Sequence, residues 1–143
     1  MKVDKIIVHH SLTKDSETVS WGAIRKYHKE QGWLDIGYHA GVELTKSGDG
    51  LYYEALIGRD WDVPGAHTVG QNSSSLGICF VGNWDTQEPP DEMLITGAKV
   101  IKMWCWLFDI SMDEIYGHRD FADYKSCPGL SFDMNKLRYL VGK

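Results

Sequence analysis

Apolar residues gather in short stretches along the first part of the chain, and these stretches predict strands. Lys5 to His10 is rich in β-branched residues, and Leu76 to Val81 is nearly all apolar, so both predict buried strands. Between them, Ile36 to Thr45 and Leu51 to Ile57 predict two paired strands joined by the turn Ser47-Gly48-Asp49-Gly50. These four segments together predict a sheet.

Other segments carry apolar residues at helical spacing. Ser20 can cap a helix that runs to about Gln31. Asp91 to Phe108 repeats apolar residues every three or four positions, with further hydrophobic residues on both sides, and we expect a largely buried helix. Phe132 to Val141 predicts a closing helix.

The remaining segments complete a topology. Ser11 to Glu17 is polar and predicts a loop, Glu114 to Tyr116 predicts a short strand, and Gly117 to Leu130 predicts a second loop. The order βαβββαβα predicts an α/β fold, with a central mixed sheet flanked by helices. Because no repeat or linker divides residues 1–143, we expect a single domain.

Composition and charge exclude several classes of protein. With 43% hydrophobic and 24% charged residues the chain is globular, and no apolar run is long enough for insertion into a membrane. A formal net charge of -5 argues against a nucleic-acid partner. The apolar stretch Ile6 to Val8 is too short for a signal peptide, and the three cysteines give no complete disulfide framework. We therefore expect synthesis in a reducing cytoplasm.

Three candidate metal ligands lie at the ends of predicted elements. His9 ends the first strand, His118 follows the short late strand, and Cys127 lies in the next loop. Two imidazoles and a thiolate suit Zn²⁺, and three protein ligands leave a fourth position open, as in catalytic sites. Since neighbouring strand residues face opposite sides, only one of His9 and His10 can face a metal, while spacing alone leaves His39 open as a further ligand. An ordinary loop histidine and a buried cysteine are the alternative interpretation.

Five sequence blocks lie in order along nearly the whole chain. They are IVHHS at 7–11, GWLDIGYH at 32–39, the segment 65–72 that begins GAH, SLGI at 75–78, and GHRD at 117–120 with CPG at 127–129. Together these blocks closely resemble the type 2 N-acetylmuramoyl-L-alanine amidases, a family that includes phage lysozyme-type endolysins and the peptidoglycan recognition proteins of animals.

The resemblance implies an activity and a ligand set. It implies hydrolysis of the amide bond between N-acetylmuramic acid and L-alanine in bacterial peptidoglycan, with one Zn²⁺ held by His9, His118 and Cys127. His10 is then left to support or pack. The resemblance also implies that the protein acts on the cell wall after release from the cytoplasm, and we expect a monomer.

The resemblance further implies residues for catalysis and binding. It places Tyr38 and Lys125 beside the metal, where we expect Lys125 to stabilise the tetrahedral oxyanion and Tyr38 to hydrogen-bond the attacking water or the same oxygen. Which of the two handles the proton stays open. His67 and Asn72 fall in a segment that the family uses along its substrate groove, so both are expected to contact substrate.

Other residues in these blocks are assigned structural roles. We expect no catalytic role for Arg119 or Asp120, which can brace the loop between the second and third ligands. His28, on the first predicted helix, is interpreted as a structural histidine.

Two rival functions stay open. Some peptidoglycan recognition proteins bind muropeptide without cutting it, and their cysteine ligand is typically replaced, whereas Cys127 is present here. A peptidase that cuts within the stem peptide is the other rival, and the sequence has no HExxH motif to support it. An amidase is therefore favoured over both.

Overall fold

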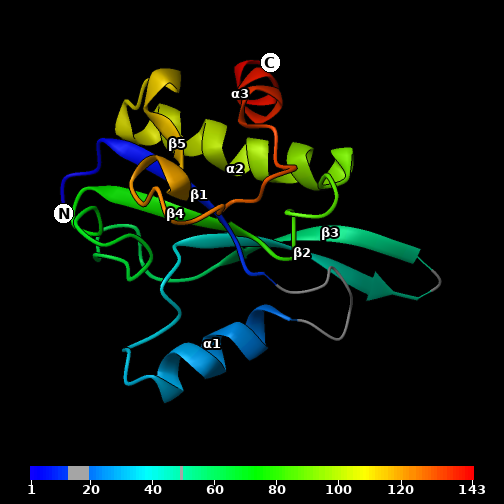
Figure 1. The fold of residues 1–143 in the computed structure, drawn as a ribbon, viewed down its shortest axis with the longest axis horizontal. Helices are drawn as coiled ribbons and strands as arrows, with labels where there is room; N and C mark the ends of the chain where they lie inside the picture. Colours follow the sequence, from blue (N-terminus) through cyan, green and yellow to red (C-terminus); the bar gives the residue numbers. More distant parts are fainter. Residues whose placement is uncertain (13–19, 49) are drawn as a thin grey trace.

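A five-stranded mixed sheet lies at the centre of the protein (Figure 1). The computed structural model describes residues 1–12, 20–48 and 50–143. The strand order is β3-β2-β4-β1-β5, with β2 and β3 antiparallel and the other neighbouring pairs parallel. The elements are β1 (Lys5–His10), α1 (Trp21–Glu30), β2 (Ala40–Ser47), β3 (Gly50–Ile57), β4 (Ser75–Phe80), α2 (Asp91–Phe108), η1 (Met112–Glu114), β5 (Ile115–Gly117), η2 (His118–Asp120) and α3 (Met134–Gly142).

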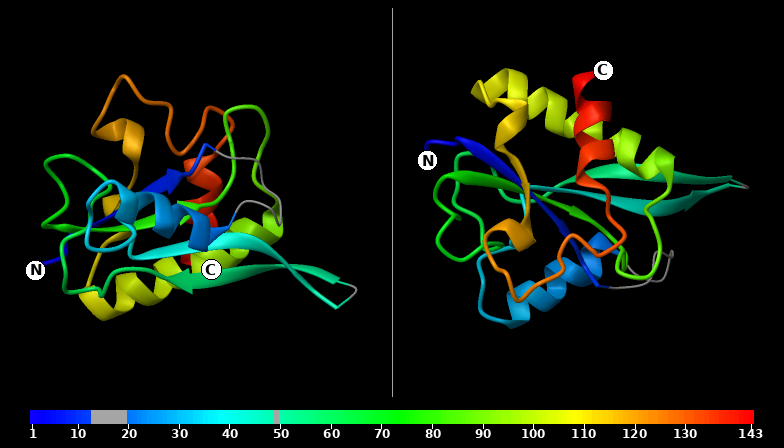
Figure 2. Two further views of the ribbon diagram at one scale, coloured as in Figure 1. Left: turned by 90° about the horizontal axis from the view of Figure 1, so that it is seen from below. Right: turned by 45° about the horizontal axis from the view of Figure 1, so that its top comes forward.

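Helices cover both faces of the sheet. Helices α2 and α3 lie on one face and α1 lies on the other (Figures 1 and 2). The main core lies between the sheet and α2 and α3, where Trp84 and Trp104 are among the largest fully buried side chains. Trp21 of α1 belongs to a smaller cluster with Ile36 and Cys79. The predicted α/β fold with a mixed sheet between helices is confirmed.

Strand β1 lies between two parallel neighbours, and it is buried on both faces because helices cover both sides of the sheet (Figure 1). Ile6, Ile7 and Val8 have no exposed surface. In the register of the sheet, His9 stands beside Cys79 of β4, and Val8 stands beside Gly117, the last residue of β5. The carboxyl ends of β1 and β5 therefore meet at one edge, which is where ligands bind in open α/β sheets.

Most predicted elements have the expected bounds, with small shifts. Strand β1 and helix α2 match the prediction, and Ser20 caps α1 by accepting a hydrogen bond from the Ala23 amide. Strand β5 begins one residue later than predicted, and α3 begins at Met134. Residues 13–19 and 49 lie outside the described part of the chain, so the predicted loop after β1 and the tip of the predicted turn are only partly covered.

Two predictions about these elements were wrong. Strand β2 begins at Ala40 and not at Ile36, because the main chain of Gly37 bonds elsewhere: its amide donates to His28 Nδ1 and its carbonyl accepts from Ala66. Helix α2 is not largely buried. Trp106, near its end, is 82% exposed, because only the opposite side of the helix packs on the sheet.

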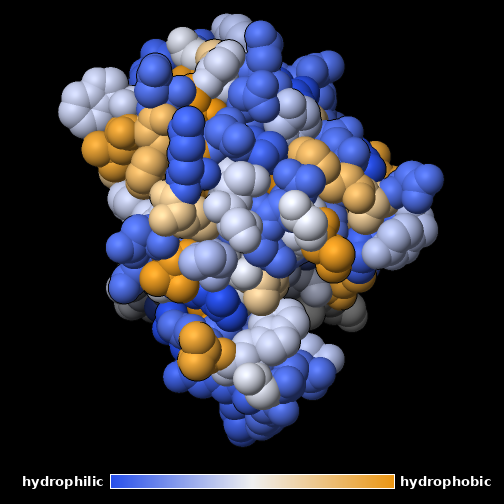
Figure 3. Space-filling view, turned by 90° about the vertical axis from the view of Figure 1, so that its left-hand side faces the viewer, coloured by the Kyte–Doolittle hydropathy of each residue, from blue (hydrophilic) through white to orange (hydrophobic). Residues whose placement is uncertain are grey.

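Within the described residues, none of the helices is both long and apolar enough to cross a membrane. Figure 3 shows one face of the molecule, on which hydrophobic side chains form several small groups separated by hydrophilic ones.

Candidate metal centre

The three candidate ligands meet at the edge where β1 and β5 end. His9 is the fifth residue of β1 and is 1% exposed, and His118 is the first residue of η2, which lies against β1 (Figure 2). The ligand atoms of His9, His118 and Cys127 all lie within 4.8 Å of one another. The fold therefore brings together the three residues that the sequence predicted as ligands, although His9 and Cys127 are 118 positions apart in the chain.

The donor set and its spacing fit a zinc ion. His9 Nδ1 lies 3.6 Å from Cys127 Sγ, and the ring centroids of His9 and His118 are 4.6 Å apart. Zn–N bonds of about 2.0 Å and Zn–S bonds of about 2.3 Å at a tetrahedral angle put the two donor atoms about 3.5 Å apart, close to the observed distance. The observed separation between nitrogen and sulfur thus matches two ligands of one ion.

The loop that carries Cys127 is held by hydrogen bonds from the GHRD block. The Arg119 amide donates to the Cys127 carbonyl at 2.8 Å, and the Arg119 guanidinium donates to the Gly129 carbonyl at 2.7 Å. Asp120 accepts a hydrogen bond from the Gly117 amide at 2.9 Å. Arg119 and Asp120 thus brace the segment between the ligands.

The protonation states of the two histidines suit metal binding. Burial, followed by the charges of neighbouring histidines, holds the pKa of His9 well below its ordinary value. Burial and then the Lys125 cation lower the pKa of His118 to about 4. Both rings are therefore neutral at pH 7, and a neutral imidazole has one nitrogen lone pair to offer.

The environment of Cys127 favours the protonated thiol. Burial raises the pKa of its thiol to about 11, although the His10 amide and the Lys125 cation act in the opposite direction. The His10 amide lies 3.4 Å from the sulfur and donates to it. A metal bound here would displace the thiol proton, and this amide would stabilise the thiolate.

Other histidines are occupied elsewhere. His10 Nδ1 accepts a hydrogen bond from the Trp84 amide at 3.1 Å. His39 Nδ1 accepts from the Gly77 amide, and its Nε2 donates to the Val63 carbonyl. Within the described ranges the metal-capable group is limited to the three predicted ligands, so the open alternative of His10 or His39 as a ligand gains no support.

A cavity of about 310 Å³ opens beside this group. Its wall combines charged, polar, aromatic and small apolar residues. It is lined by Trp33, Ala66, His67, Thr68, Val69, Asn72, His118, Phe121, Ala122, Tyr124 and Lys125. Lys125 is thus placed on the cavity wall together with the ligand His118.

Tyr38 lies against the ligand His9. Their ring centroids are 5.2 Å apart, and Tyr38 is not part of the cavity lining. Burial, followed by the proximity of Cys79 and Cys127, raises the pKa of Tyr38 well above its ordinary value, and its hydroxyl is hydrogen-bonded with Cys79. The Tyr38 hydroxyl is therefore neutral, and in this structure it donates a hydrogen bond to Cys79.

The two predicted substrate contacts line the cavity, and both also make hydrogen bonds inside the protein. Asn72 Oδ1 accepts from the amides of His67 and Thr68, both at 2.9 Å, which holds this loop closed. His67 is 9% exposed, and its Nδ1 lies 2.9 Å from His9 Nε2. Burial, followed by the charges of His39 and His118, lowers the pKa of His67 to about 3, against a hydrogen bond with the Ser75 main chain that raises it.

Two residues near His67 were missed by the sequence analysis. The Thr68 hydroxyl lies 2.9 Å from His67 Nδ1 and 3.3 Å from His9 Nε2. Ser75 is fully buried, with its hydroxyl 3.5 Å from His67 Nε2. Both residues lie inside recognised blocks, but a lone serine or threonine carries no pattern that indicates such a contact.

Three protein donors beside an open cavity are typical of a catalytic metal site, so fold and site together are those of an α/β protein whose His-His-Cys group could hold a catalytic metal ion.

Comparison with known proteins shows the family to which the chain belongs. Residues 1–130 match the family model described as N-acetylmuramoyl-L-alanine amidase. The endolysin of Escherichia phage T7 is 48% identical over 139 residues, which cover 93% of this chain and 83% of that protein. The chain belongs to the N-acetylmuramoyl-L-alanine amidase family.

Solved structures show the same fold. The wild-type peptidoglycan recognition protein LB of Drosophila matches with a TM-score of 0.74 at 32% identity, over 90% of this chain and 76% of that one. The N-acetylmuramoyl-L-alanine amidase LysC of Clostridium intestinale matches with a TM-score of 0.80 at 21% identity, over 99% of this chain and 86% of that one. The resemblance read from the sequence blocks is thereby confirmed.

Proposed function

We propose that this protein is a zinc-dependent enzyme that hydrolyses the amide bond between N-acetylmuramic acid and L-alanine in bacterial peptidoglycan. The observation that carries the proposal is the group of His9, His118 and Cys127 beside an open cavity. Membership of the amidase family and similarity to a phage endolysin support the reaction and the cell wall as its place of action.

The chain's own residues supply the rest of the chemistry. When bound, zinc supplies Lewis acidity toward water and toward the substrate carbonyl. Lys125 on the cavity wall provides a cation that stabilises the negative charge developing on the carbonyl oxygen as the amide is attacked. Tyr38 is neutral and lies against His9, so a turn of its hydroxyl from Cys79 toward the cavity adds a hydrogen-bond donor.

The cavity also suits a glycopeptide. Its aromatic residues Trp33, Phe121 and Tyr124 offer flat faces on which sugar and peptide groups can pack, and Asn72 and His67 line the wall between them. We propose that the muropeptide lies along this wall with its scissile amide at the three ligands.

A module that binds peptidoglycan without cutting it is the second candidate. What disfavours it is Cys127, whose sulfur is 3.6 Å from the His9 nitrogen and completes the ligand group. With two histidines alone, a metal would have too few protein donors for tight binding.

Metal analysis of the purified protein tests the proposal. We expect one zinc ion per chain, release of stem peptides from peptidoglycan, loss of this activity on chelation, and its return with Zn²⁺. The Cys127→Ala protein should lose both zinc and activity. Full zinc occupancy in Cys127→Ala, or undiminished activity in the chelated wild type, would contradict the assignment.

A further inference from the structure

A chain of hydrogen bonds leads from the main chain at Gln71 to the ring of His9. We infer from it that His67 is a positioning residue, which holds His9 in the tautomer that leaves Nδ1 free to bind the metal. That a metal binds to His9 rests on the proposed function. The position of the protons on His9 and His67 in the metal-free protein does not depend on that function.

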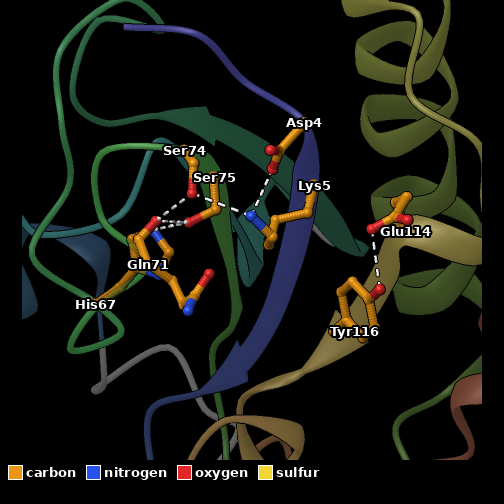
Figure 4. A network of polar contacts seen from close by, with 8 residues as sticks. All are labelled: Asp4, Lys5, His67, Gln71, Ser74, Ser75, Glu114 and Tyr116. Carbon is orange, nitrogen blue, oxygen red and sulfur yellow. Dashed lines mark hydrogen bonds and ion pairs between the residues drawn. The ribbon is translucent and has the colours of Figure 1, made fainter.

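The chain begins at a buried serine (Figure 4). The Ser75 hydroxyl donates to the Gln71 carbonyl at 2.6 Å. A hydroxyl has one proton, so Ser75 Oγ offers only lone pairs to His67 Nε2, which lies 3.5 Å away. The hydrogen bond between His67 and the Ser75 main chain acts in the same direction, since a carbonyl only accepts. His67 therefore carries its proton on Nε2.

The next link passes from His67 to His9. A neutral imidazole with its proton on Nε2 has a lone pair on Nδ1, and His67 Nδ1 lies 2.9 Å from His9 Nε2. The Thr68 hydroxyl can accept from His9 Nε2 or donate to His67 Nδ1. The Thr68 hydroxyl could instead donate to His9 Nε2, but the lone pairs of His9 Nε2 and His67 Nδ1 would then face each other at 2.9 Å and repel. His9 Nε2 is therefore the atom that carries the proton.

The last link is the metal-facing nitrogen. With its proton on Nε2, His9 keeps a lone pair on Nδ1, the atom 3.6 Å from Cys127 Sγ. The opposite tautomer would place an N–H bond at that position and block coordination. Residues that fix the tautomer of a metal-binding histidine typically raise metal affinity 10- to 100-fold.

Two glycines hold the His67 ring in place for this role. A Cβ atom on Gly77 would lie 2.7 Å from the ring, and one on Gly65 would lie 2.6 Å from it. Both distances are shorter than van der Waals contact, so the absence of side chains at 65 and 77 leaves a slot that the ring fills. Gly77 belongs to β4 and gives the slot a rigid wall.

Nitrogen NMR of the metal-free wild type tests the inference without zinc. The ¹⁵N shifts and long-range couplings of a histidine ring distinguish its two neutral tautomers. We expect both His9 and His67 to carry the proton on Nε2 at pH 7. A His9 ring protonated on Nδ1 would overturn the inference even if the protein proves to be a zinc amidase.

Zinc titration of variants tests the consequence. We expect His67→Ala to bind zinc about 10- to 100-fold more weakly than wild type. Ser75→Ala should weaken binding less and should populate the second tautomer of His67 in the NMR spectrum. Ser74→Ala is the matched control, because its hydroxyl accepts from Lys5 and does not contact His67, so its affinity should stay within about twofold of wild type (Figure 4).

The outcomes separate this inference from the proposed function. Circular dichroism and the melting temperature of each metal-free variant show whether it folds. Unchanged zinc affinity in a folded His67→Ala would overturn the positioning role while leaving the zinc site intact. A wild type that binds no zinc would overturn the proposed metal, and the NMR spectrum would still decide the tautomer. Should His67→Ala fail to fold, Ser75→Ala with wild-type affinity and an unchanged spectrum would overturn the inference.

Discussion

Two adjacent histidines at the end of β1 have different roles. His9 faces His118 and Cys127, whereas the His10 ring accepts from the Trp84 amide on the other side of the sheet. The alternation of side chains along a strand predicts that only one can face a metal, and the family resemblance chose His9. Its neighbour contributes through its main chain, since the His10 amide donates to Cys127 Sγ.

Replacing His9 and His10 separately should distinguish the metal ligand from the structural histidine. We expect His9→Ala to lose zinc, because two protein ligands remain. His10→Ala should keep most of its zinc, since the amide that donates to Cys127 is retained, although it should melt at a lower temperature. Zinc content measured by atomic emission checks both variants. Zinc lost from His10→Ala and kept in His9→Ala would reverse the assignment.

Lys125 separates chemistry from metal binding. It lines the cavity but is not a ligand, so Lys125→Ala should fold and keep its zinc. Removing one donor to a developing oxyanion typically lowers turnover about 100- to 1000-fold, and we expect that fall in kcat with little change in KM. Lys102→Ala on helix α2 serves as the control. Wild-type turnover in Lys125→Ala would show that this lysine has no role in catalysis.

At the scale of elements, the sequence predicted the periodic segments well and the local exceptions poorly. Helix α2 and strand β1 have clear periodicity and the predicted bounds. The start of β2 was missed because the Gly37 main chain bonds to His28, a partner nine residues away that a strand pattern does not reveal. The exposed side of α2 was missed because Trp106 looks like a core residue in sequence.

Asp35 fastens helix α1 to the segment before β2. Its carboxylate accepts from the Ile36 amide and from Arg25 of α1, both at 2.7 Å. Burial alone would raise its pKa, but these hydrogen bonds outweigh burial and hold the pKa below its ordinary value. A lowered carboxyl pKa stabilises the fold above about pH 4, and this contribution is lost as the pH falls through the pKa of the folded state.

Asp35→Asn should therefore destabilise the protein in a pH-dependent way. We expect a loss of about 1 kcal/mol in the free energy of unfolding at pH 7, limited by solvent screening, and a smaller loss at pH 3. Urea unfolding at both pH values measures it, with the exposed Asp123→Asn as control. An equal loss at both pH values would show that the charge of Asp35 contributes nothing.

For the whole molecule, the set of metal ligands could be predicted from the sequence, but the hydrogen bonds between His67, His9 and Ser75 could not. His9, His118 and Cys127 could be identified because strand ends and family blocks mark them. The structure brings them within 4.8 Å. The contacts of His67 with His9 and Ser75 arise from three segments that meet only in the folded chain. Sequence patterns report periodicity along one segment, so such contacts stay out of reach.

The products of peptidoglycan digestion test the central claim most directly. Purified sacculi are incubated with the zinc-loaded protein, and the soluble products are identified by mass spectrometry and end-group labelling. An N-acetylmuramoyl-L-alanine amidase releases intact stem peptides with free L-alanine amino termini and leaves the glycan strands uncut. New reducing sugar ends, or amino termini created within the stem peptide, would contradict the proposed function.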